Sequence, residues 1–208
     1  LEGGNHLQEL QRLNERRQDL LEHMLREVKG MVDPAAPLLA AVSPTFHVGI
    51  IGLLASKLTE KHGKPSCVGL ERDSDVTCSL RSIRGYSLVH ALRRCSSHLL
   101  SSGGHEMAGG CTLERGAWRA FAEALTEDVR LVLGEEMLAP ALPIDAELTE
   151  EQCTLDCARS LQKLEPFGEG NREPRFLLRN TPMGWARTVG RDGRHLQCQV
   201  GRTKAVGF

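Results

Sequence analysis

The sequence lacks the features of membrane and secreted proteins. No apolar run approaches the roughly 18 to 20 residues that span a bilayer, and the first residues do not have the basic and then apolar pattern of a secretory signal. We therefore expect no membrane partner. An initiator methionine is also missing, so we expect the chain to be part of a longer one.

Aromatic residues and paired cysteines are scarce as well. Aromatic residues make up only 4% of the chain, so base stacking cannot be widespread. The seven cysteines are scattered without a C-x-x-C pair, which argues against a disulfide framework and a zinc site. Cys153 and Cys157 alone have helical spacing, and we interpret them as small buried residues. These observations favour a reduced, cytoplasmic protein.

The common motifs of hydrolytic enzymes are missing too. His105-Glu106 begins the H-E-x-x-H zinc motif, but position 109 is glycine. There is no Walker loop, no G-x-S-x-G and no G-x-G-x-x-G after a strand. No dense cluster of Asp and His is present that would hold two divalent ions. We expect no catalytic residue, metal site or cofactor within these 208 residues.

The charges nearly cancel, with a formal net of −1, but they are segregated along the chain. Residues 123–156 carry ten acids and one arginine, whereas residues 172–204 carry eight cations and two acids. Such runs are either solvated faces or, for the basic one, a surface that follows a phosphate backbone. Both interpretations stay open from the sequence.

The most informative stretch that is present is residues 101–110, SSGGHEMAGG. Glycines allow positive φ and let backbone N–H groups approach an anion, while an imidazole can donate to a phosphate oxygen. We therefore predict a phosphate-binding turn formed by Gly103, Gly104 and His105. The alternative is a glycine turn with a purely conformational role.

A second candidate anion site combines hydroxyl and guanidinium groups, which suit phosphate oxygens. These groups belong to Ser79, Arg81, Ser82 and Arg84. The alternative for Arg81 is a surface salt bridge to Asp73 or Asp75. His47 lies near an expected helix N-terminus, where an anion is stabilised, although a core or capping role is the interpretation we favour for it alone.

Hydrophobic periodicity predicts alternating helices and strands. We expect helices at 7–28, 47–63, 87–100 and 117–133, and strands at 38–42, 67–70, 76–80 and 110–113. The proline-containing residues 139–143 predict a boundary. After it we expect a strand at 144–148, a helix at 155–164 and strands at 176–178, 185–189 and 196–200, with a turn at 191–193.

The expected organisation is a helix over 1–30, an α/β domain over 31–138, and a linker, helix and small β unit over 139–208. Alternation of strands and helices is typical of a mixed α/β domain. The β unit has too few residues for a closed five-stranded barrel.

Taken in order, these elements resemble the C-terminal part of the RecJ-type single-stranded-DNA exonucleases, members of the DHH phosphoesterase superfamily. LNERRQDLLEH resembles that family's connector helix. HVGIIGLLASKL, SLRSIRGYSLVHAL and SSGGHEMAGG resemble its DHH-associated domain, and LEPFGEGN and VGRDGRHLQCQV resemble the start of its OB-fold domain. The resemblance covers nearly the whole chain. Two residues depart from the pattern: Arg172, where the family usually has proline, and Cys78, where a small residue is usual.

The resemblance implies a fold of connector helix, mixed-sheet DHH-associated domain and partial OB-fold barrel. It also implies that the intact protein needs Mn²⁺ or Mg²⁺ and degrades single-stranded DNA from the 5′ end in repair and recombination. The catalytic Asp-His-His domain would precede Leu1. In this chain Ser79, Arg81, Gly104 and His105 would hold the strand near the scissile phosphate, His47 would support them, and the basic β unit would guide the remaining strand.

Three alternatives remain open. A similar glycine-histidine turn occurs in a module attached to alanyl-tRNA synthetases. Short-oligonucleotide or cyclic-dinucleotide phosphodiesterases of the same superfamily usually have no OB-fold after the glycine turn. Finally, the helix at 7–28 could dock on a partner protein, with no nucleic acid involved.

Overall fold

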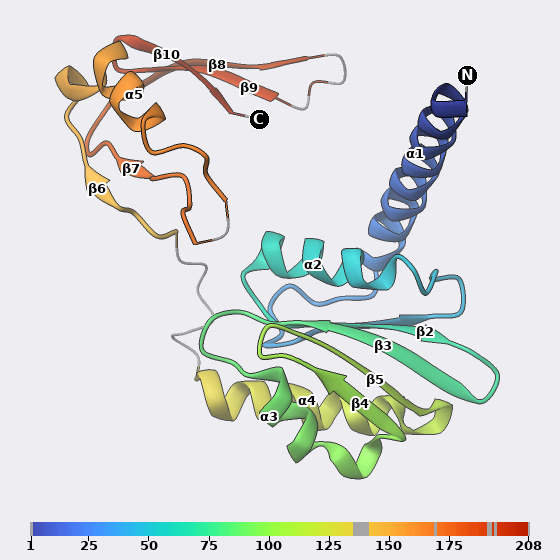
Figure 1. Ribbon diagram of the computed structural model, residues 1–208. Helices are drawn as coiled ribbons and strands as arrows, with labels where there is room; N and C mark the ends of the chain where they lie inside the picture. Colours follow the sequence, from blue (N-terminus) through green and yellow to red (C-terminus); the bar gives the residue numbers. More distant parts are fainter. Residues whose placement is uncertain (1, 135–141, 169, 191–192, 194, 208) are drawn as a thin grey trace. The chain divides into compact units, whose positions relative to one another are not determined.

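The computed structural model describes residues 2–134, 142–168, 170–190, 193 and 195–207 (Figure 1). The chain divides into two compact units, Leu1–Ala141 and Leu142–Phe208. The boundary expected at 139–143 and the turn expected at 191–193 lie largely outside the described residues. The domain bounds given above therefore stay predictions.

The first unit begins with helix α1, Glu2–Val28, which confirms the helix expected from the leucine periodicity. The two ends of its apolar stripe have different surroundings. Leu7, Leu10 and Leu13 are exposed, whereas Met24 and Val28 are buried in the core of the unit. The C-terminal part of the helix is thus held by tertiary packing.

Five strands form the sheet of this unit, in the order β1-β2-β3-β5-β4. The strands are β1 Leu39–Ser43, β2 Ser66–Glu71, β3 Asp75–Arg81, β4 Ser101–Gly104 and β5 Ala108–Glu114. β1 pairs with β2 in parallel and the other pairs are antiparallel, which confirms a mixed sheet. Along β3, residues 76, 78 and 80 are buried while 77, 79 and 81 are half-buried on the opposite face.

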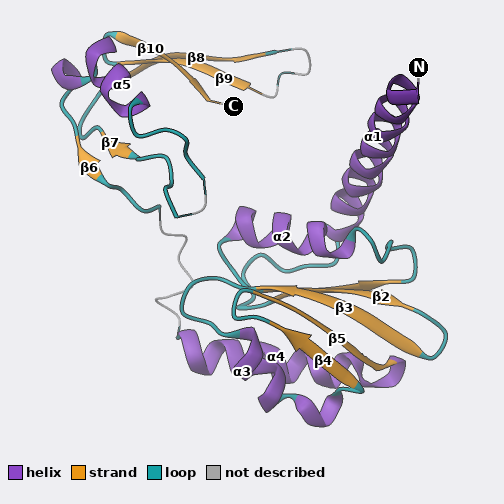
Figure 2. Ribbon diagram, in the orientation of Figure 1, coloured by secondary structure: helices purple, strands orange, loops and turns teal. Residues whose placement is uncertain are grey.

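Helices cover both faces of the sheet (Figure 2). Helix α2, Ile51–His62, packs on β2 and β3 on one face. Helices α3, Leu88–Arg94, and α4, Trp118–Leu133, lie on the other. The 3-10 turns η1, Ser96–His98, and η2, Arg115–Ala117, precede β4 and α4. Helix α3 is shorter than expected because the serines at 96 and 97 favour turns over a helix interior.

The glycine stretch differs from its prediction. Gly103 and Gly104 do not lie in a turn but in β4, where they pair with Gly110 and Gly109 of β5. The chain reverses after them, at 105–107. A Cβ atom on Gly104 would lie 2.4 Å from the carbonyl oxygen of Ala108, so the glycine permits close pairing of the two strands.

The second unit holds two small sheets. β8 Met183–Val189, β9 His195–Val200 and β10 Thr203–Gly207 form an antiparallel sheet, and β6 Ala146–Glu147 pairs in parallel with β7 Phe176–Leu177. The 3-10 turn η4, Glu150–Gln152, and helix α5, Leu155–Gln162, lie between β6 and β7 in the chain. Strand β10 was not expected, because its sequence TKAVG shows no clear alternation.

The interpretation of Cys153 and Cys157 as buried is wrong. Cys153, which follows the turn η4, is exposed, and Cys157 is only half-buried because α5 has no buried residue. All seven cysteines are free thiols. None of the described helices contains an apolar stretch long enough to cross a membrane.

Candidate nucleic-acid interface

Arg81, the last residue of β3, makes three hydrogen bonds, one to helix α2 and two to its own strand. Its Nε donates to Ser56 Oγ at 3.0 Å, and its Nη1 donates to Ser79 Oγ at 3.2 Å and to the carbonyl oxygen of Leu80 at 2.8 Å. A Cβ atom on Gly52 would lie 3.2 Å from Nη2, so the glycine lets the guanidinium lie close to the helix. The head group is therefore fixed before any ligand arrives.

The positive charge of Arg81 has no carboxylate partner among the described residues. The salt bridge considered above is not formed, because Asp75 lies at the opposite end of β3 and pairs with Arg72 at 3.3 Å. Nε and Nη1 of Arg81 use their protons within the protein, while Nη2 has no acceptor in the described part of the chain. Arg81 thus offers a positioned, uncompensated donor.

The hairpin between β4 and β5 lies at the same end of the sheet as Arg81. Arg81 is directly opposite Ala108 of β5, and the carbonyl oxygen of Ala108 accepts the His105 N–H at 2.8 Å. Two positions back along β3, Ser79 forms a row with Gly110 and Gly103 across three strands. Residues 101–107 are exposed throughout. The structure therefore brings Ser79, Arg81 and the hairpin together at one edge.

Two of the predicted site residues, Ser82 and Arg84, lie in the loop after β3, where one is buried and the other is exposed. Ser82 is buried, and its hydroxyl donates to the carbonyl oxygen of Tyr86 at 2.6 Å. It shapes the loop and presents no hydroxyl to solvent, which corrects the expected direct contact. Arg84 is exposed and lines a hollow of about 510 Å³ together with Glu106 of the hairpin.

His47 lies in the turn before α2. Its Nδ1 accepts the N–H of Gly49 at 3.1 Å, and its ring is exposed. Glu27 of α1 steadies this turn because Thr45 and Ser43 both donate to it, which also holds the pKa of Glu27 below its ordinary value. No described hydrogen bond joins His47 to Arg81 or to the hairpin. Its ring bonds within the turn before α2, and the helix itself has no side-chain cap.

Two residues that contact Arg81 were missed from the sequence, Gly52 and Ser56. Both lie on the face of α2 that is turned toward β3, one helical turn apart. A glycine within a predicted helix was the available signal, because it often marks close approach of another group.

The three-stranded sheet of the second unit carries an aromatic side chain flanked by two cations. Trp185 is 44% exposed. The guanidinium carbon of Arg187 lies 5.5 Å from the centre of its ring and the ammonium nitrogen of Lys204 lies 5.9 Å away. Both cations lie within the range of a cation–π contact. The group offers a stacking surface beside positive charge.

Part of the basic run is neutralised by the acidic run. Asp145 accepts from Arg172 at 2.6 Å, and Glu147 accepts from Arg179 at 2.5 Å. Glu150 accepts the backbone N–H of Arg202. Acidic and basic residues that are separate in the sequence are therefore partly paired with each other within the second unit. Arg191 and Arg194 lie outside the described residues.

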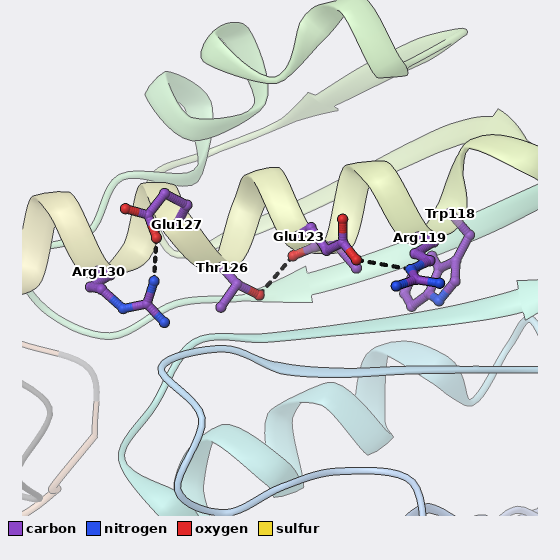
Figure 3. A pocket seen from close by; sticks show the side chains of 7 residues that line it. Trp118, Arg119, Glu123, Thr126, Glu127 and Arg130 are labelled. Carbon is purple, nitrogen blue, oxygen red and sulfur yellow. Dashed lines mark hydrogen bonds and ion pairs between the residues drawn. The ribbon is translucent and has the colours of Figure 1, made fainter.

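The outer face of α4 forms a hollow of about 590 Å³, but its charges satisfy one another (Figure 3). Arg119 pairs with Glu123 at 2.9 Å and Arg130 with Glu127. We assign no ligand to this hollow. Within the described parts of both units, no group of three or more His, Cys, Asp or Glu side chains is arranged to hold a metal ion.

Comparison with known families gives two matches along the chain. Residues 35–131 match the DHHA1 domain, and residues 144–208 match the RecJ OB domain. The first match contains the Arg81 and hairpin site, and the second contains Trp185. Together they confirm the expected order of a DHH-associated domain followed by an OB-fold domain.

Curated relatives match over most of this chain. The single-stranded-DNA-specific exonuclease RecJ of Thermus thermophilus is 37% identical over 203 residues, which are 96% of this chain and 29% of the relative. The protein of the same name from Bacillus subtilis is 28% identical, over 96% of this chain and 27% of its own length. The chain thus spans less than a third of these relatives.

Solved structures agree with the sequence matches. Crystal structures of RecJ from Thermus thermophilus in complex with Mg²⁺ and with Mn²⁺ superpose with TM-scores of 0.74 and 0.75. They are 31% and 32% identical to this chain, cover 96% of it, and are themselves covered over 31% and 29% of their length. The arrangement of elements described above is therefore shared with these proteins.

Proposed function

The chain belongs to the RecJ family, whose C-terminal part it matches, and we propose that it forms the DNA-binding part of a single-stranded-DNA-specific exonuclease. In this proposal Arg81, Ser79 and the hairpin residues Gly103, Gly104 and His105 hold the phosphate backbone. Arg84 extends the contact along the loop, and His47 and Ser82 support the site by shaping the turns that surround it.

The observation that carries the proposal is the state of the Arg81 guanidinium. It is fixed by Ser56, Ser79 and Leu80, it has no carboxylate partner among the described residues, and it lies at the sheet end that bears an exposed glycine hairpin. A fixed guanidinium donates to phosphate oxygens at low entropic cost. Because the exposed glycines of the hairpin have no side chain, a DNA strand can approach their backbone closely.

The second unit would bind the strand further from the site of cleavage. Trp185 offers a face for one base, and Arg187 and Lys204 lie where they can contact the adjoining phosphates. Stacking and phosphate contacts discriminate poorly between sequences. We therefore expect binding with little sequence preference.

Hydrolysis would require metal ions held by residues other than those described here, since no described cluster fits one. Mn²⁺ or Mg²⁺ is the metal we propose for the whole protein, because related RecJ crystal structures contain these ions. Cleavage from the 5′ end, a role in DNA repair and recombination, and a cytoplasmic location, which the free thiols favour, belong to the same proposal.

The proposal is tested by replacing Arg81 with alanine and measuring binding of a labelled single-stranded oligonucleotide by fluorescence anisotropy. Loss of a charge-assisted contact of about 1.5–3 kcal/mol weakens binding on the order of tenfold to a hundredfold. Arg119→Ala removes an equal charge from the outer face of α4 and should change the affinity less than twofold.

Equal effects of the two substitutions would show that Arg81 contributes only general charge. A transfer RNA, measured in parallel, addresses the alternative of a tRNA-related module. Tighter binding of the transfer RNA than of the oligonucleotide would overturn the assignment to single-stranded DNA.

A further inference from the structure

Glu27 lies in the last turn of helix α1, where a carboxylate does not stabilise the helix itself. The C-terminal end of a helix dipole is negative, so a cation such as Arg26 suits this end and a glutamate opposes it. The Glu27 side chain is also half-buried although it carries a charge. Its position is therefore explained by its contacts with the rest of the first unit.

Two hydroxyl groups from the end of β1 and the segment after it converge on one oxygen of this carboxylate. Ser43 Oγ donates to Oε1 of Glu27 at 2.7 Å, and Thr45 Oγ1 donates to the same atom at 2.6 Å. Ser43 is buried, and its hydroxyl oxygen also accepts the backbone N–H of Thr45 at 3.2 Å. The bonds from Thr45 and Ser43 hold the pKa of Glu27 below its ordinary value. Glu27 thus fixes the conformation of the chain between β1 and α2.

The same segment sets the start of helix α2. The carbonyl oxygen of His47 accepts the N–H groups of Ile50 and Ile51, at 2.8 and 3.1 Å, and these bonds begin the helix. Among the described residues, no side chain caps this first turn. Phe46, which precedes His47, is buried in the cluster that also contains the end of α1. The position of the first turn of α2 therefore depends on the backbone of residues 43–49 and on its link to α1.

The first two turns of α2 carry the groups that hold the Arg81 guanidinium. Ser56 Oγ accepts from Nε of Arg81 at 3.0 Å and donates to the carbonyl oxygen of Gly52 at 3.1 Å. A Cβ atom on Gly52 would lie 3.2 Å from Nη2 of Arg81, which shows how closely the helix backbone approaches the guanidinium. A displacement of the helix start would therefore move the acceptor that holds Arg81.

We propose that Glu27 is a positioning residue for the DNA-binding edge. It acts through the segment at 43–49 and the first turns of α2, and thereby sets where Ser56 holds the Arg81 guanidinium. This inference rests on the proposed function, because it requires Arg81 to bind the phosphate backbone. Glu27 does not bind DNA itself, since a carboxylate repels phosphate. Its effect on DNA affinity is therefore opposite in sign to the effect of its charge.

Glu27→Ala in the 208-residue chain tests this sign, with a labelled single-stranded oligonucleotide and fluorescence anisotropy. Removal of a negative charge by itself would strengthen DNA binding. We expect the reverse, a loss of affinity of about threefold to tenfold, the usual size for a residue that acts through its neighbours. Glu15→Ala removes an equal charge from the exposed part of α1 and should not weaken binding.

Glu27→Gln is the conservative variant. Its amide oxygen replaces Oε1, the atom that accepts both hydroxyl groups, so the affinity should stay within about twofold of the wild-type value although the charge is gone. Thr45→Val removes one of the two donors at an exposed position and should weaken binding in the same direction as Glu27→Ala. Unfolding midpoints of all variants verify that each is folded at the temperature of the binding assay.

A double-mutant cycle separates positioning of Arg81 from a general weakening of the fold. In the Arg81→Ala background, Glu27→Ala should change the affinity less than about twofold, because the group that it positions is gone. An equal loss in both backgrounds, or no loss in the wild-type background, would overturn the inference while Arg81 keeps its role. A glutamine variant that binds as weakly as the alanine variant would overturn it as well. If Arg81→Ala itself leaves the affinity unchanged, the proposed function and this inference both fail.

Discussion

At the residue scale, the hairpin depends on Gly104 far more than on its neighbour. Gly104 has φ of 142°, a conformation that side chains rarely adopt, and an added Cβ would lie 2.4 Å from the carbonyl oxygen of Ala108. Gly103 has open space around its Cα, with nothing within 4 Å of an added Cβ. Two adjacent glycines thus have different requirements.

We therefore expect Gly104→Ala to lower the free energy of unfolding by about 1–3 kcal/mol, because strain and steric overlap both oppose the native hairpin. Gly103→Ala should change it by less than about 0.5 kcal/mol. Urea denaturation followed by circular dichroism measures both. Comparable stabilities of the two variants would show that β4 and β5 separate at little cost.

A second residue-scale feature is Asp128 of α4, which joins three elements. The Tyr86 hydroxyl donates to it at 2.7 Å, and Arg94 donates from Nη2 at 2.8 Å. Burial opposes ionisation of Asp128, but the bonds from Arg94 and Tyr86 outweigh it and hold the pKa of Asp128 below its ordinary value. The loop after β3 and helix α3 are both anchored through this carboxylate.

Asp128→Asn should lower the free energy of unfolding by about 1–3 kcal/mol near neutral pH, because the hydrogen bonds from Tyr86 and Arg94 would no longer have a charged acceptor. A carboxylate with a depressed pKa stabilises the fold fully above its unfolded-state pKa, and this contribution is lost as pH falls through the lower folded-state pKa. The difference between the wild-type chain and the variant should thus be constant from about pH 5 to 7 and shrink below about pH 4. Thermal unfolding across this range measures it, and a constant difference down to pH 3 would contradict the assignment.

The two departures from the family pattern also have residue-scale explanations. Arg172 pairs with Asp145, so it replaces proline with an ion pair that fixes the same loop. Cys78 is buried in the sheet core directly opposite Cys111, away from the face that carries Arg81. The hydrogen bond with Cys111 lowers the pKa of Cys78, but the hydrogen bond with Cys67 and burial together raise it further, so the residue stays neutral. Neither change touches the proposed DNA contacts.

At the element scale, strand β3 divides its side chains between two tasks. Val76, Cys78 and Leu80 face the core under α3 and α4, and Ser79 and Arg81 face α2. Because of this alternation, the core-facing side chains of β3 are fixed by packing. Ser79 and Arg81 lie on the opposite face, at the end of the sheet that carries the exposed glycine hairpin. The predicted site residues depend on this register, because a shift by one residue would bury Arg81.

The sheet of β8, β9 and β10 supplies the second element-scale prediction. Trp185→Ala should weaken binding of single-stranded oligonucleotide by about 1–3 kcal/mol, the usual contribution of one stacked base. Trp185→Phe retains an aromatic face and should recover most of the loss. Fluorescence anisotropy measures both, with Leu155→Ala on the exposed side of α5 as a control. If the phenylalanine variant binds as weakly as the alanine variant, stacking is not the contribution of Trp185.

At the scale of the whole molecule, the charges are arranged so that a nearly neutral chain retains unpaired cations at selected places. Ion pairs such as Arg172–Asp145 and Arg179–Glu147 consume part of the basic run, and they are exposed enough to contribute little stability each. Arg81, Arg187 and Lys204 have no carboxylate partner within the described residues. The net charge of the chain therefore gives no indication of the unpaired cations at the proposed interface.

We expect the 208-residue chain to bind single-stranded DNA weakly, with an affinity that falls linearly on a logarithmic scale as salt increases, because phosphate contacts release counterions. We also expect no cleavage when Mn²⁺ is added, since no described cluster of side chains fits a metal. Gel analysis of an end-labelled oligonucleotide checks cleavage, and anisotropy from low to high salt checks binding. Shortening of the oligonucleotide by a highly purified sample would contradict the second expectation.

The sequence by itself determined the class of fold and the family. Leucine periodicity located α1, alternation located β3, and the ordered glycine, serine and arginine motifs pointed to a DHH-associated domain followed by an OB-fold domain. These signals are local, since each depends on residues within one or two turns or strands. They also indicated which side chains suit a phosphate.

Only the tertiary structure decided how those side chains are held. It placed Gly103 and Gly104 in a paired strand, buried Ser82, and joined Arg81 to Ser56, which lies 25 positions earlier in the chain. It likewise paired part of the acidic run with part of the basic one. Contacts between distant residues arise from packing of whole elements on the sheet, and hydrophobic periodicity contains no information about which distant hydroxyl or carboxylate a given arginine will meet.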